Sequence, residues 1–339
     1  MATQLHPHES RPSAAPQAAA TAARRTASHP NMRWIEGGTF LMGSNDFYPE
    51  EAPAHQVTVS GFWMDATTVT NYDFARFVAA TGYVTVAERP LDPRQFPGAD
   101  PALLVPGALV FSQTRRPVDM KNFRAWWKYV PGACWCRPEG PDSSIADRGD
   151  HPVVQVAYDD AFAYAHWAGK SLPTEAEWEF AARGGLEGAA YTWGDEFTPR
   201  GVHMANTWQG QFPWQNLGTD GFQGTAPAKS FPSNGYGLYQ MAGNVWEWTR
   251  DWYRDRHKKP NSHKACCIPV NPRGPSMEHS FDNCMPKIRI PRRVLKGGSF
   301  LCAPNYCRRY RPAARYPQMI DTAACHIGFR CIIEATAGS

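Results

Sequence analysis

Apolar and polar positions recur with two different periods along this chain, and each period predicts a type of element. Residues 55–59 alternate at every second position, which is typical of a half-buried strand. The stretch 34–43 places aromatic and β-branched residues between glycines and predicts two short strands. Apolar residues follow helical spacing after Thr70, and Gly82 supplies a stop, so we expect a helix over 71–81.

Two further helices are predicted later in the chain. One covers 159–167, and the other follows the capping-box sequence that begins at Thr174 and continues through Ala182. The proline-rich stretch 89–118 predicts an irregular surface insertion, whereas glycine, proline and aromatic residues predict loops and short strands over 184–331. We therefore expect an α+β fold with low regular secondary structure.

A single domain is expected over 32–334, because the sequence shows neither a repeat nor a clean linker there. Residues 1–31 are rich in Ala and Pro and lack the bulky side chains of a core, so we expect a disordered tail. Residues 335–339 form a short C-terminal tail. A secretory signal has an apolar run after its first charged residues. The N-terminal region has no such run, which favours a cytoplasmic protein.

Charge and hydropathy argue against two classes of partner. The 35 basic and 31 acidic residues give a net charge of only +4, which is too balanced for a nucleic-acid binder. The mean hydropathy is -0.50 and no 18-residue stretch is continuously apolar, so we expect no membrane association. The 13 Trp, 13 Tyr and 17 Phe residues predict a core that buries much aromatic surface.

The strongest candidate for chemistry is the run 296–310, which contains Cys302 and Cys307. On spacing alone, the two cysteines fit either ordinary buried thiols or a soft, low-coordinate ion such as Cu(I), for which thiolate is a preferred ligand. A structural zinc ion would require more ligands than this pair supplies. Arginines that would favour the thiolate form lie close by in sequence: Arg308, Arg309 and Arg311.

A second group of residues carries oxygen donors in loop sequences. It comprises Asn206, Asp220, Asn244 and Glu247. Such side chains together with loop carbonyls suit a hard cation such as Ca²⁺, but Asn and Asp also commonly cap turns. The neighbouring Trp246 is either a core residue or part of a peptide-binding groove.

Taken together, these segments resemble the formylglycine-generating enzyme family, also called sulfatase-modifying factors, in its bacterial form. The matching stretches are 37–43, 151–154, 167–178, 206–210, 220–227, 234–239, 243–248, 293–299 and 328–331. The block that holds Ser299, Cys302, Tyr306 and Cys307 is the most specific, because it matches the active enzymes.

The resemblance implies a C-type-lectin-like fold and an oxidase. The expected reaction uses O₂ and a thiol reductant to convert a cysteine, within an unfolded Cys-x-Pro-x-Arg segment of a sulfatase, to Cα-formylglycine. By similarity, Cys302 and Cys307 hold Cu(I), the substrate thiolate joins them, and Ser299 and Tyr306 border the site. Trp246 is expected to contact the substrate, and the protein is expected to act as a monomer.

The resemblance also implies two calcium sites. The first would use the side chains of Asn206 and Asp220 with the carbonyl oxygens of Thr207 and Phe222. The second would use Gln240, Gly243, Val245 and Glu247, although the family often has Asn where this chain has Gln240.

Seven cysteines lie outside the expected copper site. Secreted relatives carry two disulfides, but the matching positions here include Ala165, Ala182 and Pro312, so Cys331 has no partner. We expect free thiols, as in a reducing cytoplasm, at Cys134, Cys136, Cys266, Cys267, Cys284, Cys325 and Cys331. A further metal or redox site among them stays open.

Two alternative functions would require different residues from those of the oxidase. A non-catalytic lectin-like binding module of the same superfamily would not need both Cys302 and Cys307 beside Ser299. An iron-dependent sulfoxide synthase would need a His-x3-His-x-Glu motif, and that spacing does not occur in the sequence.

Overall fold

A computed structural model describes residues 29–95, 98–101, 104–258 and 268–335. The helices are α2 (Asn71–Thr81), α3 (Tyr158–Trp167) and α4 (Glu175–Arg183). The strands are β1 (Met32–Ile35), β2 (Gly38–Met42), β3 (His55–Val59), β4 (Phe62–Asp65), β5 (Gly107–Phe111), β6 (Trp127–Pro131), β7 (Trp246–Trp252), β8 (Arg292–Lys296), β9 (Arg315–Met319), β10 (Ile327–Gly328) and β11 (Ile332–Glu334). Long loops connect these short elements, as the sequence predicted.

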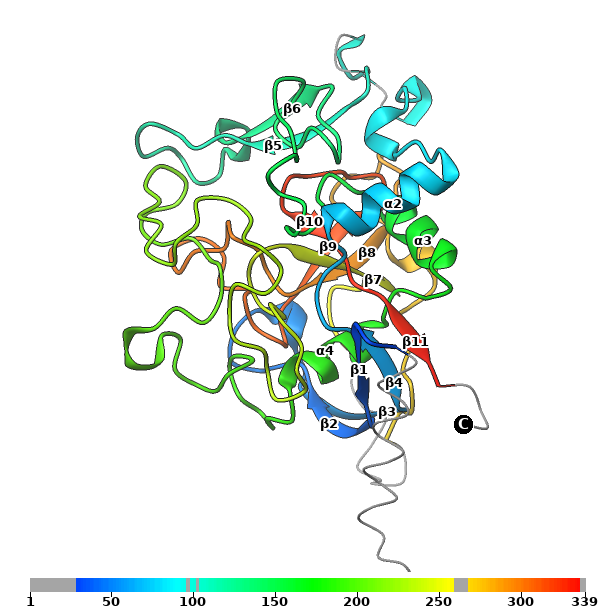
Figure 1. The fold of residues 1–339 in the computed structure, drawn as a ribbon, viewed down its shortest axis with the longest axis vertical. Helices are drawn as coiled ribbons and strands as arrows, with labels where there is room; N and C mark the ends of the chain where they lie inside the picture. The colour runs from blue at the N-terminus through cyan, green and yellow to red at the C-terminus, as the bar shows by residue number, and fades with distance from the viewer. Residues whose placement is uncertain (1–28, 96–97, 102–103, 259–267, 336–339) are drawn as a thin grey trace, which may run out of the picture.

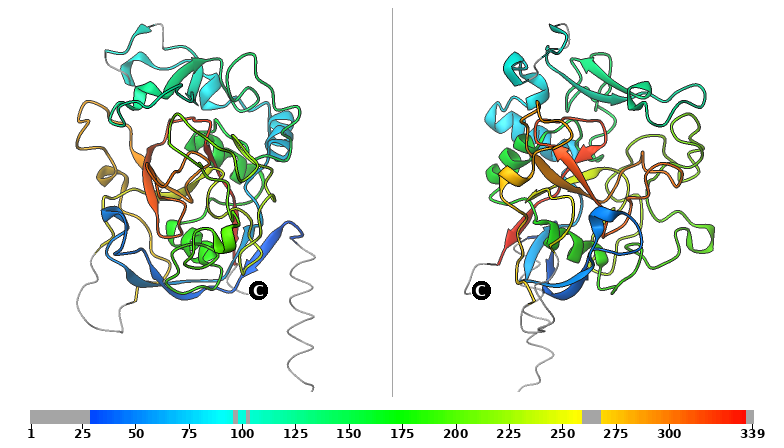
Figure 2. Two further views of the ribbon diagram at one scale, coloured as in Figure 1. Left: turned by 90° about the vertical axis from the view of Figure 1, so that its left-hand side faces the viewer. Right: turned by 180° about the vertical axis from the view of Figure 1, so that it is seen from behind.

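The described residues form four small sheets. The central sheet has the order β10-β7-β8-β9, in which β10 and β7 run parallel and the other pairs antiparallel. Sheet β1-β4-β11 and hairpin β2-β3 lie together at one end of the molecule, whereas hairpin β5-β6 lies at the opposite end (Figures 1 and 2). The loops between α4 and β7 and those after β8 occupy one side of the central sheet (Figure 1).

The helices begin and end where their capping residues predict. The Thr70 side chain accepts a hydrogen bond from the backbone N–H of Asp73, and Gly82 ends α2 with a φ of 65°. Thr174 caps α4 in the same way, with Glu177 completing the capping box. The prediction of all three helices is therefore confirmed, with boundaries within one residue of those expected.

The prediction of an irregular insertion over 89–118 is wrong in part. Strand β5 lies within it and pairs with β6 in a regular antiparallel register from Gly107 to Phe111. Alternate side chains of β5 face opposite ways: Ala108 and Val110 are buried in a small core, and Leu109 lines the cavity described below. Residues 107–111 read Gly-Ala-Leu-Val-Phe and are apolar throughout, so they carry no alternating pattern that would have indicated a strand.

The core is divided between two main clusters. One packs α2 and α3 against the central sheet through rings such as Phe74, Tyr164 and Phe329. The other packs α4 against the hairpin β2-β3 and strand β4, with Trp178 fully buried. In the described ranges, no helix is long and apolar enough to cross a membrane. The N-terminal tail prediction falls almost entirely on residues 1–28, which lie outside the described residues, as do residues 336–339.

Candidate active site

Cys302 and Cys307 lie in direct contact in the loop between β8 and β9. Their sulfur atoms are 3.1 Å apart. Tight turns place them, since the Cys302 N–H donates to the Ser299 carbonyl at 2.9 Å and the Cys307 N–H donates to the Ala303 carbonyl at 2.8 Å. Cys302 is buried and its sulfur accepts from the Ser299 backbone N–H at 3.4 Å, whereas Cys307 is half-buried. The predicted cysteine pair is therefore assembled as one site.

The two thiols differ in acidity. A hydrogen bond from Cys302, together with the nearby Arg309 guanidinium, lowers the pKa of Cys307 to about 7 against the opposing effect of burial. Burial raises the pKa of Cys302, and the adjacent Cys307 raises it further. Arg309 lies 3.9 Å from the Cys307 sulfur through Nη1 and pairs with Glu50 at 2.5 Å. The pair can therefore hold one thiolate and one thiol near neutral pH.

Tyr306 forms an aromatic wall beside the cysteines. Its ring stacks on Phe212 at 4.2 Å between centroids and only 6° between planes, and it meets Trp126 edge-on at 5.8 Å. Burial raises the pKa of the Tyr306 phenol, so the hydroxyl stays protonated at neutral pH. A rigid aromatic surface next to the two sulfurs suits contact with a peptide.

The cysteine pair opens into a cavity of about 900 Å³. Cys302, Cys307, Ser299, Tyr306 and Trp246 all line it, so the five residues predicted for catalysis and substrate contact share one site. Residues that the sequence analysis did not select also line it: Leu109, Trp127, Lys128 and Tyr129 of hairpin β5-β6, and His326. The His326 ring lies 4.8 Å from that of Trp127, and burial lowers its pKa to about 3.

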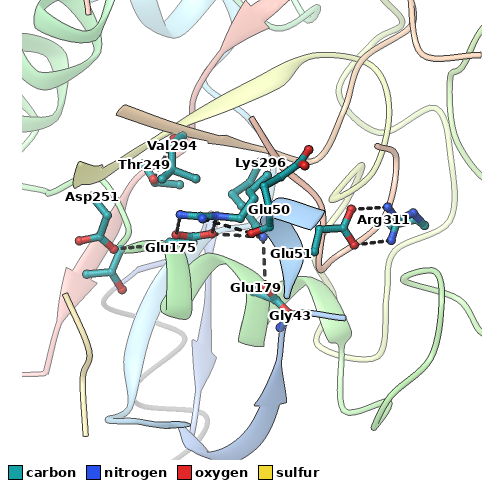
Figure 3. A network of polar contacts seen from close by, with 12 residues as sticks. Gly43, Glu50, Glu51, Glu175, Glu179, Thr249, Asp251, Val294, Lys296 and Arg311 are labelled. Carbon is teal, nitrogen blue, oxygen red and sulfur yellow. Dashed lines mark hydrogen bonds and ion pairs between the residues drawn. The ribbon is translucent and has the colours of Figure 1, made fainter. Parts of the chain in front are cut away.

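Buried ion pairs hold the polypeptide on both sides of the cysteine loop. Arg311 makes two hydrogen bonds to Glu51, and Lys296 contacts Glu179 at 3.0 Å; all four side chains are buried (Figure 3). Removing one partner of such a pair leaves an unpaired buried charge, which costs about 3–5 kcal/mol. These pairs therefore fix the ends of the segment that carries the cysteines.

Two of the four ligands predicted for the first calcium site converge on one position. The Gln209 amide nitrogen donates both to the Thr207 carbonyl and, at 2.7 Å, to Asp220 Oδ2, so these two expected ligands point to a common position. The Asn206 amide donates to the Gly224 carbonyl at 2.8 Å. Asp220 Oδ1 accepts from the Phe222 N–H at 3.0 Å. A carboxylate oxygen and a loop carbonyl at a shared position suit a hard cation such as calcium.

The second predicted calcium site has a different character. Both oxygens of the buried Glu247 accept hydrogen bonds from Arg330, at 2.7 and 2.8 Å, and Oε2 also accepts from the Trp178 indole. The Gln240 side-chain oxygen accepts from Asn244. A calcium ion bound at this position would share its single carboxylate with the Arg330 cation. In the structure, Glu247 anchors β7 to Arg330.

Five of the other cysteines are free thiols in the described part of the chain. Cys325 and Cys331 are buried, Cys284 is exposed, and Cys134 and Cys136 lie together after β6. The prediction of free thiols is confirmed for these five. Cys266 and Cys267 lie outside the described residues.

Comparison with known proteins identifies the family. Residues 17–335 match the family described as Sulfatase-modifying factor enzyme 1-like domain. The chain is 57% identical over 304 residues to a formylglycine-generating enzyme of Mycobacterium tuberculosis, covering 90% of this chain and 98% of that protein. It is also 38% identical over 314 residues to the Mus musculus protein named inactive Cα-formylglycine-generating enzyme 2, covering 91% and 87% respectively.

A solved structure supports the same assignment at the level of fold. The Pseudomonas aeruginosa protein PvdO matches with a TM-score of 0.59 at 22% identity, over 90% of this chain and 94% of that one. The α+β fold with little regular structure is thereby confirmed. The chain belongs to the family of sulfatase-modifying factors, whose members include proteins named formylglycine-generating enzymes and a protein named inactive.

Proposed function

We propose that this chain is an active formylglycine-generating enzyme that acts on a cysteine of a sulfatase. The observation that carries the proposal is the contact of Cys302 with Cys307, 3.1 Å apart at the wall of an open cavity. Family membership alone does not decide activity, since one relative is named inactive. Two adjacent thiols, one of them acidic, fit a Cu(I) ion, for which thiolates are preferred ligands.

The proposed reaction is R–CH₂–SH + O₂ + 2 e⁻ + 2 H⁺ → R–CHO + H₂S + H₂O. The substrate cysteine supplies two electrons, and external thiols supply the other two. Copper bound by Cys302 and Cys307 would supply the activation of oxygen. The chain itself favours the thiolate form of Cys307 through the hydrogen bond from Cys302 and the charge of Arg309, and buries Cys302 away from bulk water.

The walls of the cavity suit a peptide in an extended form. The ring of Tyr306 is fixed by stacking on Phe212, and Trp246 and Trp127 present further aromatic surface. Residues of hairpin β5-β6 line the same cavity. We propose that a Cys-x-Pro-x-Arg segment binds here with its cysteine directed to the two sulfurs, before the sulfatase folds around that segment.

Calcium has a structural role in this proposal. The loop that contains Asn206, Thr207, Asp220 and Phe222 has no regular strand or helix, so one Ca²⁺ ion bound by its oxygens would order it. The Gln209 amide would turn away or present its own oxygen to the ion. One such site is proposed, because Glu247 is already paired with Arg330.

The cytoplasmic location remains part of the proposal. The five free thiols at described positions support it, because a reducing compartment opposes disulfides.

The function is tested with a synthetic Cys-x-Pro-x-Arg peptide, the copper-loaded full chain, O₂ and a thiol. The proposal expects an aldehyde at the cysteine position, trapped with a hydrazide and located by mass spectrometry. A peptide with Ser in place of Cys is the matched control and should stay unchanged. A peptide that binds but yields no aldehyde would instead identify a binding module.

A further inference from the structure

Three potential metal ligands converge at a place that the proposed reaction does not use. Glu88, Cys134 and Cys136 each direct a ligand atom to a common region, and these atoms lie within 4.8 Å of one another. The two sulfurs are 3.5 Å apart. Cys134 packs with Ala108 and Val110, which alternate along β5 with the cavity-lining Leu109, so the cluster lies on the other face of hairpin β5-β6.

The backbone fixes the two cysteines in place. Cys134 and Arg137 exchange two backbone hydrogen bonds, of 3.1 and 3.0 Å, which close a tight turn through Trp135 and Cys136. The turn follows directly on β6 and brings both sulfurs together without any long-range constraint. The ligand geometry is therefore prepared in the folded chain.

The carboxylate is also fixed. Glu88 ends the short 3₁₀ helix Val86–Glu88, and its Oε2 accepts hydrogen bonds from the backbone N–H and the hydroxyl of Thr85, at 3.0 and 2.7 Å. These bonds hold the side chain against its own helix. An ion bound there would not have to order a freely moving Glu side chain, which lowers the entropic cost of binding.

The distances fit a tetrahedral ion. Two thiolates at about 2.3 Å from a tetrahedral Zn²⁺ are separated by roughly 3.8 Å, so the observed 3.5 Å requires a shift of only a few tenths of an ångström. A disulfide would require the sulfurs to approach to about 2 Å. A carboxylate is a hard ligand, and therefore a mixed set of two thiolates and one carboxylate suits Zn²⁺ better than Cu(I).

Burial and charge agree with this chemistry. Cys134 is buried, whereas Cys136 and Glu88 are half-buried, so one side of the cluster faces solvent and can supply a water ligand. The Arg137 guanidinium lies near Cys134 and would offset the negative charge left when three anionic ligands bind one Zn²⁺.

We propose that Glu88, Cys134 and Cys136 bind one Zn²⁺ ion, with water as the fourth ligand. The site ties the 3₁₀ helix Val86–Glu88 to the end of hairpin β5-β6. Because the opposite face of this hairpin lines the cavity, zinc stiffens one wall of the substrate site without taking part in the reaction. The inference rests on local geometry and holds whether or not the chain is an oxidase.

The test uses the full chain with both cysteines of the active site replaced, as Cys302→Ser and Cys307→Ser, because they would compete for soft metals. Reduced, metal-free protein is titrated with Co²⁺ and then Zn²⁺. We expect one equivalent of Co²⁺ with the absorption of a tetrahedral thiolate site, displaced by Zn²⁺. Adding Cys136→Ser should remove that signal, and Glu88→Gln should weaken binding at least about tenfold.

Cys284→Ser is the matched control, since Cys284 is an exposed thiol elsewhere, and it should leave the titration unchanged. A second measurement uses the unmutated chain, in which Zn²⁺ should protect Cys134 and Cys136 from alkylation, as mapped by mass spectrometry. The proposal is overturned if the background protein takes up no stoichiometric Co²⁺ or Zn²⁺. It is equally overturned if Cys136→Ser binds as well as its parent, or if the cluster binds Cu(I) but not Zn²⁺.

Discussion

The backbone N–H of Trp208 donates a hydrogen bond to the carbonyl of Cys302 at 3.0 Å. Trp208 follows two of the expected calcium ligands, Asn206 and Thr207, so the bond connects the calcium loop to the cysteine site. Asn244 continues the connection: its N–H donates to Asn206 at 2.8 Å and its carbonyl accepts from the Phe300 N–H at 2.9 Å. Order in the loop is therefore transmitted to the cysteines through backbone contacts.

Removal of calcium is expected to lower both the melting temperature and the activity. Binding to the folded chain alone stabilises it by mass action, by about 3 kcal/mol when calcium is at 100 times its dissociation constant. Asp220→Ala should lower the melting temperature and make it insensitive to chelator. Differential scanning calorimetry with and without chelator checks this, and an unaltered chelator response in Asp220→Ala would contradict the site.

Replacing Arg309 with Gln is expected to raise the pKa of Cys307 from about 7 toward the ordinary value of a thiol. The cause is loss of the guanidinium that lies 3.9 Å from the sulfur. The rate of Cys307 alkylation in metal-free protein, followed against pH by peptide mapping, gives the pKa. Arg308→Gln is the control, because Arg308 is exposed and makes no contact with Cys307 that the structure records. If the alkylation rate of Cys307 depended on pH in the same way in the parent and in both variants, Arg309 would not lower the pKa of Cys307.

His326 is expected to make the folded chain sensitive to acid. Burial lowers its pKa to about 3 from 6.5, so the unfolded chain binds a proton that the folded one excludes between these values. The free energy of unfolding is therefore unaffected by His326 well above pH 6.5, and it falls progressively as the pH decreases from 6.5 toward 3. At pH 5.5 the loss is about 1 kcal/mol.

Urea unfolding of the parent and of His326→Phe measures this effect. The variant should lose less stability than the parent between pH 7.5 and 5.5, by about 1 kcal/mol. The comparison is made within each protein, so a change in packing at neutral pH does not affect it. Identical pH dependence of the two proteins would show that His326 is not buried as a neutral group.

Tyr306 is expected to act through its ring. The stack on Phe212 contributes about 0.5–1.5 kcal/mol beyond the area that it buries, and Tyr306→Phe preserves it. We expect Tyr306→Phe to keep most of the activity and Tyr306→Ala to raise KM more than it lowers kcat. Steady-state kinetics with the Cys-x-Pro-x-Arg peptide gives kcat and KM for both variants. If both variants lost activity to the same extent, the Tyr306 hydroxyl rather than its ring would be responsible.

Local signals were enough to predict the helices and the cysteine pair. Thr70 and Thr174 carry capping information within a few residues, and Cys302 and Cys307 lie within one tight loop. The contributions of Glu50 and His326 could not be predicted, because Glu50 reaches Arg309 across 259 positions of the chain and the burial of His326 depends on tertiary packing. The calcium ligands expected around Asp220 came from the resemblance, because the spacing of these loop residues does not indicate a shared site.

The central claim is that Cys302 and Cys307 together form the reaction site, and serine replacement tests it most directly. A hydroxyl is a hard ligand and does not replace thiolate for Cu(I). Cys302→Ser and Cys307→Ser should each lower the rate of aldehyde formation by more than about 100-fold. Replacing a residue that only hydrogen-bonds a metal ligand already costs about 10- to 100-fold, and loss of the ligand itself should cost more. Near-parental melting curves would show that the fold is intact.

The deciding measurement is therefore the initial rate of aldehyde formation on the Cys-x-Pro-x-Arg peptide at limiting copper, for the parent, both variants and Cys284→Ser. The account predicts activity in the parent and in Cys284→Ser, and none above background in the other two. Near-parental activity in either Cys302→Ser or Cys307→Ser would contradict it.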